Sequence, residues 1–241
     1  SDVFSVAGAA LAGNVVVATG DGSDVVDLVG TTIDGSVKLT FGIGNASVSE
    51  LREASVVTGA YEVADPDAAL VMLSNATIGT KTKIKLGSGP STVVQVLGGS
   101  TVGKLDVQTG TGGKVVQIGG SSNVGSAKLA LGDGNAIVQL DFATVAGTMQ
   151  VRAGTGKDTL TLSDHAAIGG ALRASLGDGG AFVYLDMEST IAGALDVKSG
   201  AGNDQVVLLA GSTVGTLKAK LGSGEGTVSV ENASMVLGAL D

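Results

Sequence analysis

Short runs of this chain alternate between apolar and polar residues. Gly, Asn and Ser bound these runs, and no segment shows the apolar stripe of a helix. Clear examples are Leu105-Asp106-Val107, Val116-Gln117-Ile118, Leu160-Thr161-Leu162 and Leu195-Asp196-Val197. Because a period of two places apolar side chains on one face of an extended chain, the pattern predicts an all-β protein.

A Gly-x-Gly pair recurs every 22 or 23 residues and divides the chain into ten repeat units. The first Gly of each pair is Gly20, Gly42, Gly87, Gly110, Gly132, Gly154, Gly177, Gly200 or Gly222. Asp65-Pro66-Asp67 stands where the remaining pair is due. Each unit supplies two strands and a third short apolar step, joined at corners where Gly and Asn allow the chain to turn.

One such unit cannot bury its apolar face alone, whereas stacked units can. Stacking at the spacing of parallel strands gives a rod roughly 48 Å long for ten coils. Connections between successive parallel strands favour a right-handed path. We therefore expect residues 1–241 to form a single right-handed parallel β-helix, or solenoid, with an irregular coil at residues 47–67.

A second period of 45 residues is superimposed on the first, which predicts five double coils. Five basic residues follow it: Lys38, Lys83, Lys128, Arg173 and Lys218. Large residues also follow it just before alternate Gly pairs, at Phe41, Leu86, Leu131, Leu176 and Leu221. The intervening coils carry small residues there, namely Thr19, Ala64, Thr109, Ala153 and Ser199. Large and small residues thus alternate along the stack, as interlocking layers require.

The basic residues of the long period predict a ladder of alternating charge. In register, Asp106 falls between Lys83 and Lys128, and Asp196 falls between Arg173 and Lys218, with Gln150 in the coil between the two halves. Alternation avoids stacking like charges at strand spacing. The alternative is a basic stripe that binds an acidic polymer, because Lys85, Arg152, Lys198 and Lys220 add positive charge to the same face. Gln95, Gln117 and Gln139 predict a second ladder.

The composition excludes several classes of protein. The 40 Gly residues lack the three-residue period of collagen, and with no Cys there is neither a disulfide framework nor a thiolate metal site. A net charge of −9 argues against a nucleic acid partner. The sequence contains no run of about 18 apolar residues, so it predicts no membrane-spanning helix.

Three coils read Gly-x-Gly-x-Asp followed by alternating apolar residues, starting at Gly20, Gly154 and Gly200. They resemble the calcium-binding nonapeptides of the RTX proteins. The resemblance implies that Asp24, Asp158 and Asp204 are calcium ligands. The leading Gly of that motif is missing, and the neighbouring coils place Ala136, Ala181 and Gly226 where partner carboxylates would be needed. The alternative is that each Asp caps a turn.

Other candidates for chemistry are weaker. The irregular coil gathers Glu50, Glu53, Glu62, Asp65 and Asp67, and we expect it to bulge from the rod as an acidic insertion. Ser163, Asp164 and His165 are adjacent in sequence, so a catalytic triad would require side chains that point apart to converge. Many polysaccharide lyases and hydrolases are β-helices, and Asp133 and Asp178 are two coils apart, but both look like turn residues. No catalytic residue is therefore predicted.

The Gly-x-Gly-x-Asp runs and the Thr/Ser-x-Val-Gly-x-Leu corners resemble the repeat regions of large bacterial extracellular and cell-surface β-helix proteins, such as adhesin-like and autotransporter-passenger arrays. The resemblance implies a secreted or cell-surface bacterial location and a non-enzymatic role as a structural or adhesion rod. The sequence stops at Asp241 in the middle of a repeat, so we expect it to be part of a longer array or to have an end covered by a partner. Surface glycans or proteins are the expected partners, and exposed strand edges predict end-to-end association. The alternatives are a calcium-dependent RTX-like module and a polysaccharide-binding or polysaccharide-cleaving β-helix.

Overall fold

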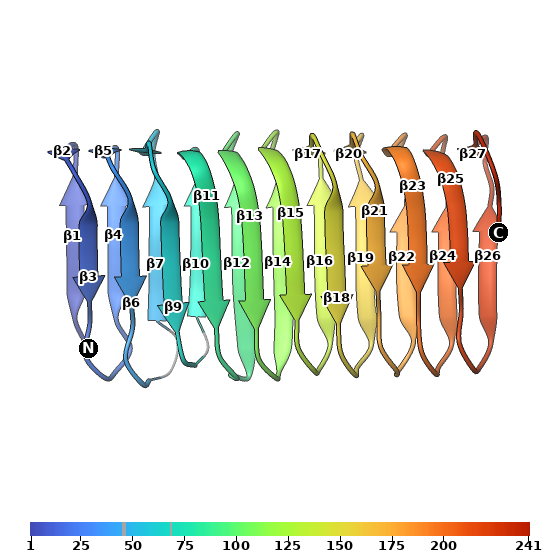
Figure 1. The fold of residues 1–241 in the computed structure, drawn as a ribbon, viewed down its shortest axis with the longest axis horizontal. Coiled ribbons are helices and arrows are strands. Elements are labelled where there is room, and N and C mark those ends of the chain that lie inside the picture. Colours follow the sequence, from blue (N-terminus) through green and yellow to red (C-terminus); the bar gives the residue numbers. More distant parts are fainter. Residues whose placement is uncertain (45–46, 68) are drawn as a thin grey trace.

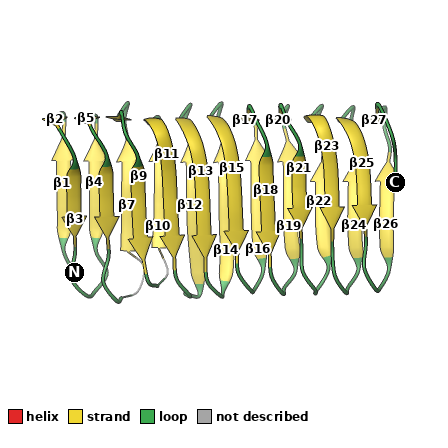
Figure 2. Cartoon of the chain, viewed as in Figure 1, coloured by secondary structure: helices red, strands yellow, loops and turns green. Residues whose placement is uncertain are grey.

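The structure, a computed structural model, describes residues 1–44, 47–67 and 69–241. Every element in these residues is a β-strand, and the strands stack side by side into a rod (Figures 1 and 2). All pairings between strands are parallel, as the predicted solenoid requires. The all-β, stacked-coil prediction is therefore confirmed.

Two long sheets form the sides of the rod. The first sheet has eleven strands in sequence order: β1 (Val3–Ala7), β4 (Val25–Val29), β7 (Ser47–Arg52), β10 (Ala69–Ser74), β12 (Ser91–Leu97), β14 (Gly113–Gly119), β16 (Ala136–Asp141), β19 (Asp158–Ser163), β22 (Ala181–Leu185), β24 (Asp204–Leu208) and β26 (Gly226–Val230).

The second sheet has sixteen strands, because the predicted third step is a separate short strand in some coils and continuous with its neighbour in others. Its strands are β2 (Ala10–Ala12), β3 (Val15–Ala18), β5 (Thr32–Asp34), β6 (Val37–Thr40), β8 (Val56–Val57), β9 (Tyr61–Asp65), β11 (Thr77–Leu86), β13 (Thr101–Thr109), β15 (Asn123–Leu131), β17 (Thr144–Val145), β18 (Met149–Ala153), β20 (Ala167–Ile168), β21 (Leu172–Ser175), β23 (Thr190–Lys198), β25 (Thr213–Lys220) and β27 (Met235–Val236).

Two corners connect the sheets in every coil. We call the turn from the first sheet to the second the serine corner, and the Gly-x-Gly turn back to the first sheet the glycine corner. In Figure 1 the first-sheet strands run upward behind second-sheet strands that run downward, while the chain advances from left to right. This path is right-handed. The ten predicted units correspond to the ten turns that lead back to the first sheet and link its eleven strands: nine are glycine corners, and Asp65-Pro66-Asp67 stands in the tenth.

The core lies between the two sheets and consists of the apolar members of each alternating run. Leu105 and Val107 of β13 and Val116 and Ile118 of β14 are at most 1% exposed, while their polar neighbours face outward. The burial alternates in the same way along nearly every strand, so the period of two seen in the sequence is the period of the packed core.

Register along the second sheet confirms the long period with one correction. Phe41, Leu86 and Leu131 occupy the predicted layer, but the residue stacked between Phe41 and Leu86 is Asp65, not Ala64. Pro66, rather than Asp65, therefore aligns with the first Gly of the neighbouring corner. The reason is that this coil lacks a Gly-x-Gly pair, so the sequence offered no residue that marked its register.

The coil at residues 47–67 does not bulge from the rod, contrary to the expectation. Its strands β7, β8 and β9 pair in register with the coils on both sides. Tyr61 is fully buried inside it, and its hydroxyl lies 2.5 Å from that of Ser49. An aromatic core residue and continuous pairing make this segment a regular part of the stack with an unusual surface.

Candidate functional site

The predicted charge ladder exists on the outer face of the second sheet. Register places Asp106 between Lys83 and Lys128, and Asp196 between Arg173 and Lys218. Two members were missed from the sequence: Glu62 lies between Lys38 and Lys83, and Asp241 pairs with Lys218 at 3.6 Å. Asp106 itself forms its ion pair with Lys81, at 3.2 Å. The acidic members of the ladder thus offset some of the positive charge on the outer face of the second sheet.

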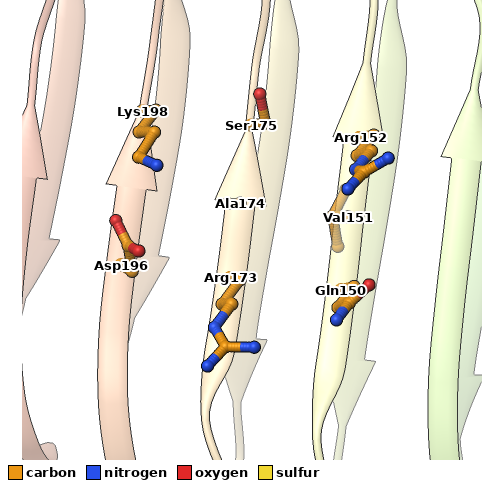
Figure 3. A pocket seen from close by; sticks show the side chains of 8 residues that line it. All are labelled: Gln150, Val151, Arg152, Arg173, Ala174, Ser175, Asp196 and Lys198. Atoms are coloured by element: carbon orange, nitrogen blue, oxygen red, sulfur yellow. The ribbon is translucent and has the colours of Figure 1, made fainter.

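A shallow hollow of about 370 Å³ lies on this face, where the ladder is most basic (Figure 3). Arg152 of β18, Arg173 of β21 and Lys198 of β23 project from three successive coils around it, and all three are exposed. Gln150, Ser175 and Asp196 complete its polar lining. The hollow is therefore a cationic surface with additional groups that can form hydrogen bonds.

Asp24, Asp158 and Asp204, the residues implied as calcium ligands, lie under the glycine corner at the start of first-sheet strands. Each is at most 1% exposed. In each case one carboxylate oxygen accepts a hydrogen bond from the backbone N–H of the coil before it, and the donors are Asp2, Ala136 and Ala181 at 2.7, 3.1 and 2.9 Å. This bond satisfies an N–H group at a strand start, which is the turn-capping role.

The three carboxylates lie in one register row of the first sheet, separate from the charge ladder, but they are not neighbours in that row. Ala181 separates Asp158 from Asp204, so these two are about 9.6 Å apart, twice the strand spacing. Among the described residues no group of three or more His, Cys, Asp or Glu side chains could hold a metal ion.

Calcium binding stays a prediction. Thermal unfolding in chelator, and then in millimolar calcium, tests it. A ligand that binds only the folded state must raise the melting temperature.

The second carboxylate oxygen distinguishes these sites. The Ser199 hydroxyl, five residues before Asp204, donates to it at 2.7 Å. Thr19 holds the same place before Asp24, but its hydroxyl does not reach full hydrogen-bond geometry. The Thr19 hydroxyl and the Asp2 N–H nevertheless keep the pKa of Asp24 below its usual range. Ala153 holds the place before Asp158 and offers no hydroxyl.

Of the three aspartates, Asp158 alone has no hydroxyl five residues before it. One of its oxygens is buried without a hydrogen-bond partner among the described residues, as is one oxygen of Asp24. Burial raises the pKa of Asp158 to about 6, against the opposing effects of the N–H groups of Ala136 and Gly177 and of the Lys114 charge. Lys114 lies in the same register row, two coils earlier, and its ammonium group donates to the Asp133 carbonyl. Sequence reasoning missed this buried lysine, which occupies the place of Asp in its own coil.

The other candidate residues do not converge. Asp133 and Asp178 accept hydrogen bonds from the backbone of the next coil, at Thr155 (2.9 Å) and Ala201 (2.7 Å). Both therefore act as turn residues. The Ser163 hydroxyl donates to Asp141, whereas the exposed His165 faces Glu188 at 3.5 Å. These contacts leave the three sequence neighbours without a shared reaction centre.

Acidic side chains from β4, from β7 and from the residue after β7 surround Arg52. The guanidinium forms a two-pronged pair with Asp27 at 2.8 and 3.1 Å, and also contacts Glu53 at 3.0 Å and Glu50 at 3.4 Å. Asp27 raises the pKa of Arg52 further, first through its hydrogen bond and then through its charge. The cluster links neighbouring coils on the outside of the first sheet, which explains why acids gather there.

A stack of buried hydroxyls at the serine corner was also missed. Each hydroxyl donates to the backbone carbonyl three residues earlier, at 2.6 Å. The residues are Ser55, Ser100, Ser189 and Ser212. Ser or Thr at this place was visible in most repeats, with exceptions such as Ala76, Ala143 and Ala166. The bond of the hydroxyl depends on a corner with left-handed backbone, such as Met187 (φ 50°) and Glu188 (φ 59°).

Compared with models of protein families, with curated proteins and with solved structures, the chain matches none of them. Among the described residues no helix has the length and apolar character needed to cross a membrane. The function of this chain is therefore inferred from its own repeat motifs, fold and surface.

Proposed function

We propose that this chain is a non-enzymatic structural or adhesion module of a secreted or cell-surface bacterial protein, in which it acts as a rigid rod. The observation that carries the proposal is continuous parallel pairing along both sheets, including the irregular coil. A stack in which each coil contacts only its neighbours gains length without changing its cross-section. Such a rod suits a stalk or a presenting surface.

The surface location rests on the repeat motifs, which resemble those of bacterial cell-surface arrays. The polar groups support the non-enzymatic part of the proposal, because the carboxylates of the corners are occupied by backbone N–H groups of adjacent coils. New reducing ends released from an acidic polysaccharide by the purified chain would contradict this part.

A distance measurement tests the rod. Val3→Cys and Thr227→Cys place one spin label on each end of the first sheet, because the two positions lie in one register row ten coils apart. We expect a single narrow distance distribution centred near about 48 Å, ten times the spacing of parallel strands. A broad distribution, as a flexible chain of this length gives, would overturn the proposal.

A further inference from the structure

The charges of the rod are strongly segregated. Eleven of the 14 basic residues lie on strands of the second sheet, compared with five of the 23 acidic residues. The rest of the chain therefore carries three basic and 18 acidic residues. The basic residues of the second sheet are Lys38, Lys81, Lys83, Lys85, Lys104, Lys128, Arg152, Arg173, Lys198, Lys218 and Lys220. An acidic protein thus presents one basic face.

Basic residues toward the C-terminal end of that face form a zigzag with one position per coil. Lys128 and Arg173 stand in the row of the charge ladder, whereas Arg152 and Lys198 stand in the row two residues further along the strands. Lys218 and Lys220 continue both rows in the next coil. Members in successive coils are about 4.8 Å apart along the rod, the spacing of parallel strands, and Lys218 and Lys220 share the last of these coils. We call these six residues the cationic zigzag.

Most of the cationic zigzag lacks internal neutralisation. Within the part of the chain that the structure describes, no ion pair joins Arg152, Arg173, Lys198 or Lys220 to an acid, although Lys218 pairs with Asp241. In the N-terminal half, Lys81 is bound to Asp106, while Lys38, Lys83, Lys85 and Lys104 form no ion pair among the described residues either. The halves differ in the ladder row, where Glu62 and Asp106 separate the N-terminal lysines, whereas the neutral Gln150 separates Lys128 from Arg173. Exposed cations at regular spacing without partners are complementary to a polymer with regularly spaced anions.

The lining of the hollow favours a sugar polymer among polyanions. Gln150, Ser175 and Asp196 supply amide, hydroxyl and carboxylate groups that can exchange hydrogen bonds with sugar hydroxyls. Among the described residues this face carries no aromatic platform for unstacked bases, because Phe4, Phe182 and Tyr184 lie on the first sheet, Phe142 lies at the serine corner after β16, and Phe41 and Tyr61 are buried. A linear polysaccharide with an acidic group on each sugar repeats its charge at a spacing comparable to that of the coils.

We propose that the cationic zigzag binds a linear acidic polysaccharide that lies along the rod axis, with Arg152, Arg173 and Lys198 as its central contacts. The proposal deepens the adhesion role and rests on the proposed function only in that respect. Binding of the polysaccharide and the end-to-end distance of the rod are separate measurements, so failure of one leaves the other interpretable.

The test measures the Kd of the purified chain for polygalacturonate, in low salt and with chelator present so that calcium cannot bridge carboxylates. The variant Arg152→Gln/Arg173→Gln/Lys198→Gln removes three positive charges at the hollow. Its control, Lys38→Gln/Lys85→Gln/Lys104→Gln, removes three exposed charges from the N-terminal half of the same face. We expect the first variant to bind at least about tenfold more weakly and the control less than about twofold.

Two further measurements make the result decisive. Arg152→Lys/Arg173→Lys keeps the charge and should retain most of the binding, and the melting temperatures of all variants should match the parent, because the altered side chains are exposed. Equal losses in the two triple variants, no binding by the parent, or duplex DNA that binds as tightly as polygalacturonate would each overturn the proposal.

Discussion

A hydroxyl five residues before a buried aspartate is the residue-scale feature that separates the sites under the glycine corner. Ser199 supplies it to Asp204, whereas Ala153 leaves one oxygen of Asp158 unpartnered. A buried acceptor without a donor costs more than a hydrogen bond gains on average, so single hydroxyls should have measurable effects at these positions.

Ala153→Ser should stabilise the protein at pH 7 by about 1 kcal/mol, because the new hydroxyl can donate to the free oxygen of Asp158 and lower its pKa. The converse variant, Ser199→Ala, should destabilise by about 1–3 kcal/mol, since it leaves Asp204 in the present state of Asp158. Chemical unfolding at pH 7 gives both values. Changes of the same sign in the two variants would show that the hydroxyl is not the decisive group.

The raised pKa of Asp158 predicts a pH dependence of stability. Its pKa is about 6 in the folded state and about 3.9 when unfolded, so between these values the folded protein holds more protons. The contribution of this group to the free energy of unfolding therefore falls as pH rises from about 4 to about 6, by roughly 1–3 kcal/mol. Asp158→Asn should remove that part of the slope, as measured by unfolding at pH 4, 5, 6 and 7. An unchanged slope would assign it to other groups.

At the scale of the element, the glycine corner is set by the close approach of successive coils. A Cβ atom on Gly177 would overlap the carbonyl group of Gly154 in the coil below. Gly20 begins the first glycine corner, and a Cβ atom placed on it would have an Asp2 side-chain oxygen as its nearest neighbour, at 4.0 Å. The first Gly of the pair therefore leaves no room for a Cβ atom at Gly177, whereas a Cβ atom fits at Gly20.

Gly177→Ala should consequently destabilise the rod by about 2 kcal/mol or more, since the overlap falls on backbone and forces two coils apart. Gly20→Ala is the matched control and should change stability by less than about 0.5 kcal/mol. The midpoints of denaturant unfolding for the two variants decide the matter. If both lose the same stability, the Gly-x-Gly pair is required for the turn itself rather than for stacking.

Strands, ladders and the double coil could be predicted from the sequence because a repeat fixes register once its period is known. Lys83, Asp106 and Lys128 were placed correctly for this reason. Asp65 was misplaced by one residue where the Gly pair that marks the period is replaced. The Ser199 hydroxyl as partner of Asp204 was not predicted, because a bond across a corner depends on local backbone geometry that a period does not specify. Lys114 broke the pattern and carried no repeating signal.

At the scale of the whole molecule, the alternation of large and small layers makes the double coil the unit of the rod. Leu86, Leu131 and Leu176 alternate with Thr109 and Ala153 in one continuous stack. Removing a double coil preserves that alternation, whereas removing one coil brings two small layers into contact. The charge ladder behaves in the same way, because removal of a single coil interrupts the alternation of basic and acidic residues.

Deletion of residues 87–131, a full double coil, should therefore leave a shorter, cooperatively folded rod, because Leu86 then precedes the corner that begins at Gly132. Deletion of residues 110–131 removes only one coil and stacks Thr109 on Ala153, with a void where Leu131 had been. We expect this smaller deletion to be the more damaging, by about 2–4 kcal/mol, the cost of losing a buried leucine that its neighbours cannot replace. Denaturant unfolding with a comparison of slopes measures both, since the slope reports the surface that remains buried. A single-coil deletion as stable as the double-coil deletion would show that the 22-residue coil, and not the 45-residue pair, is the unit that the core recognises.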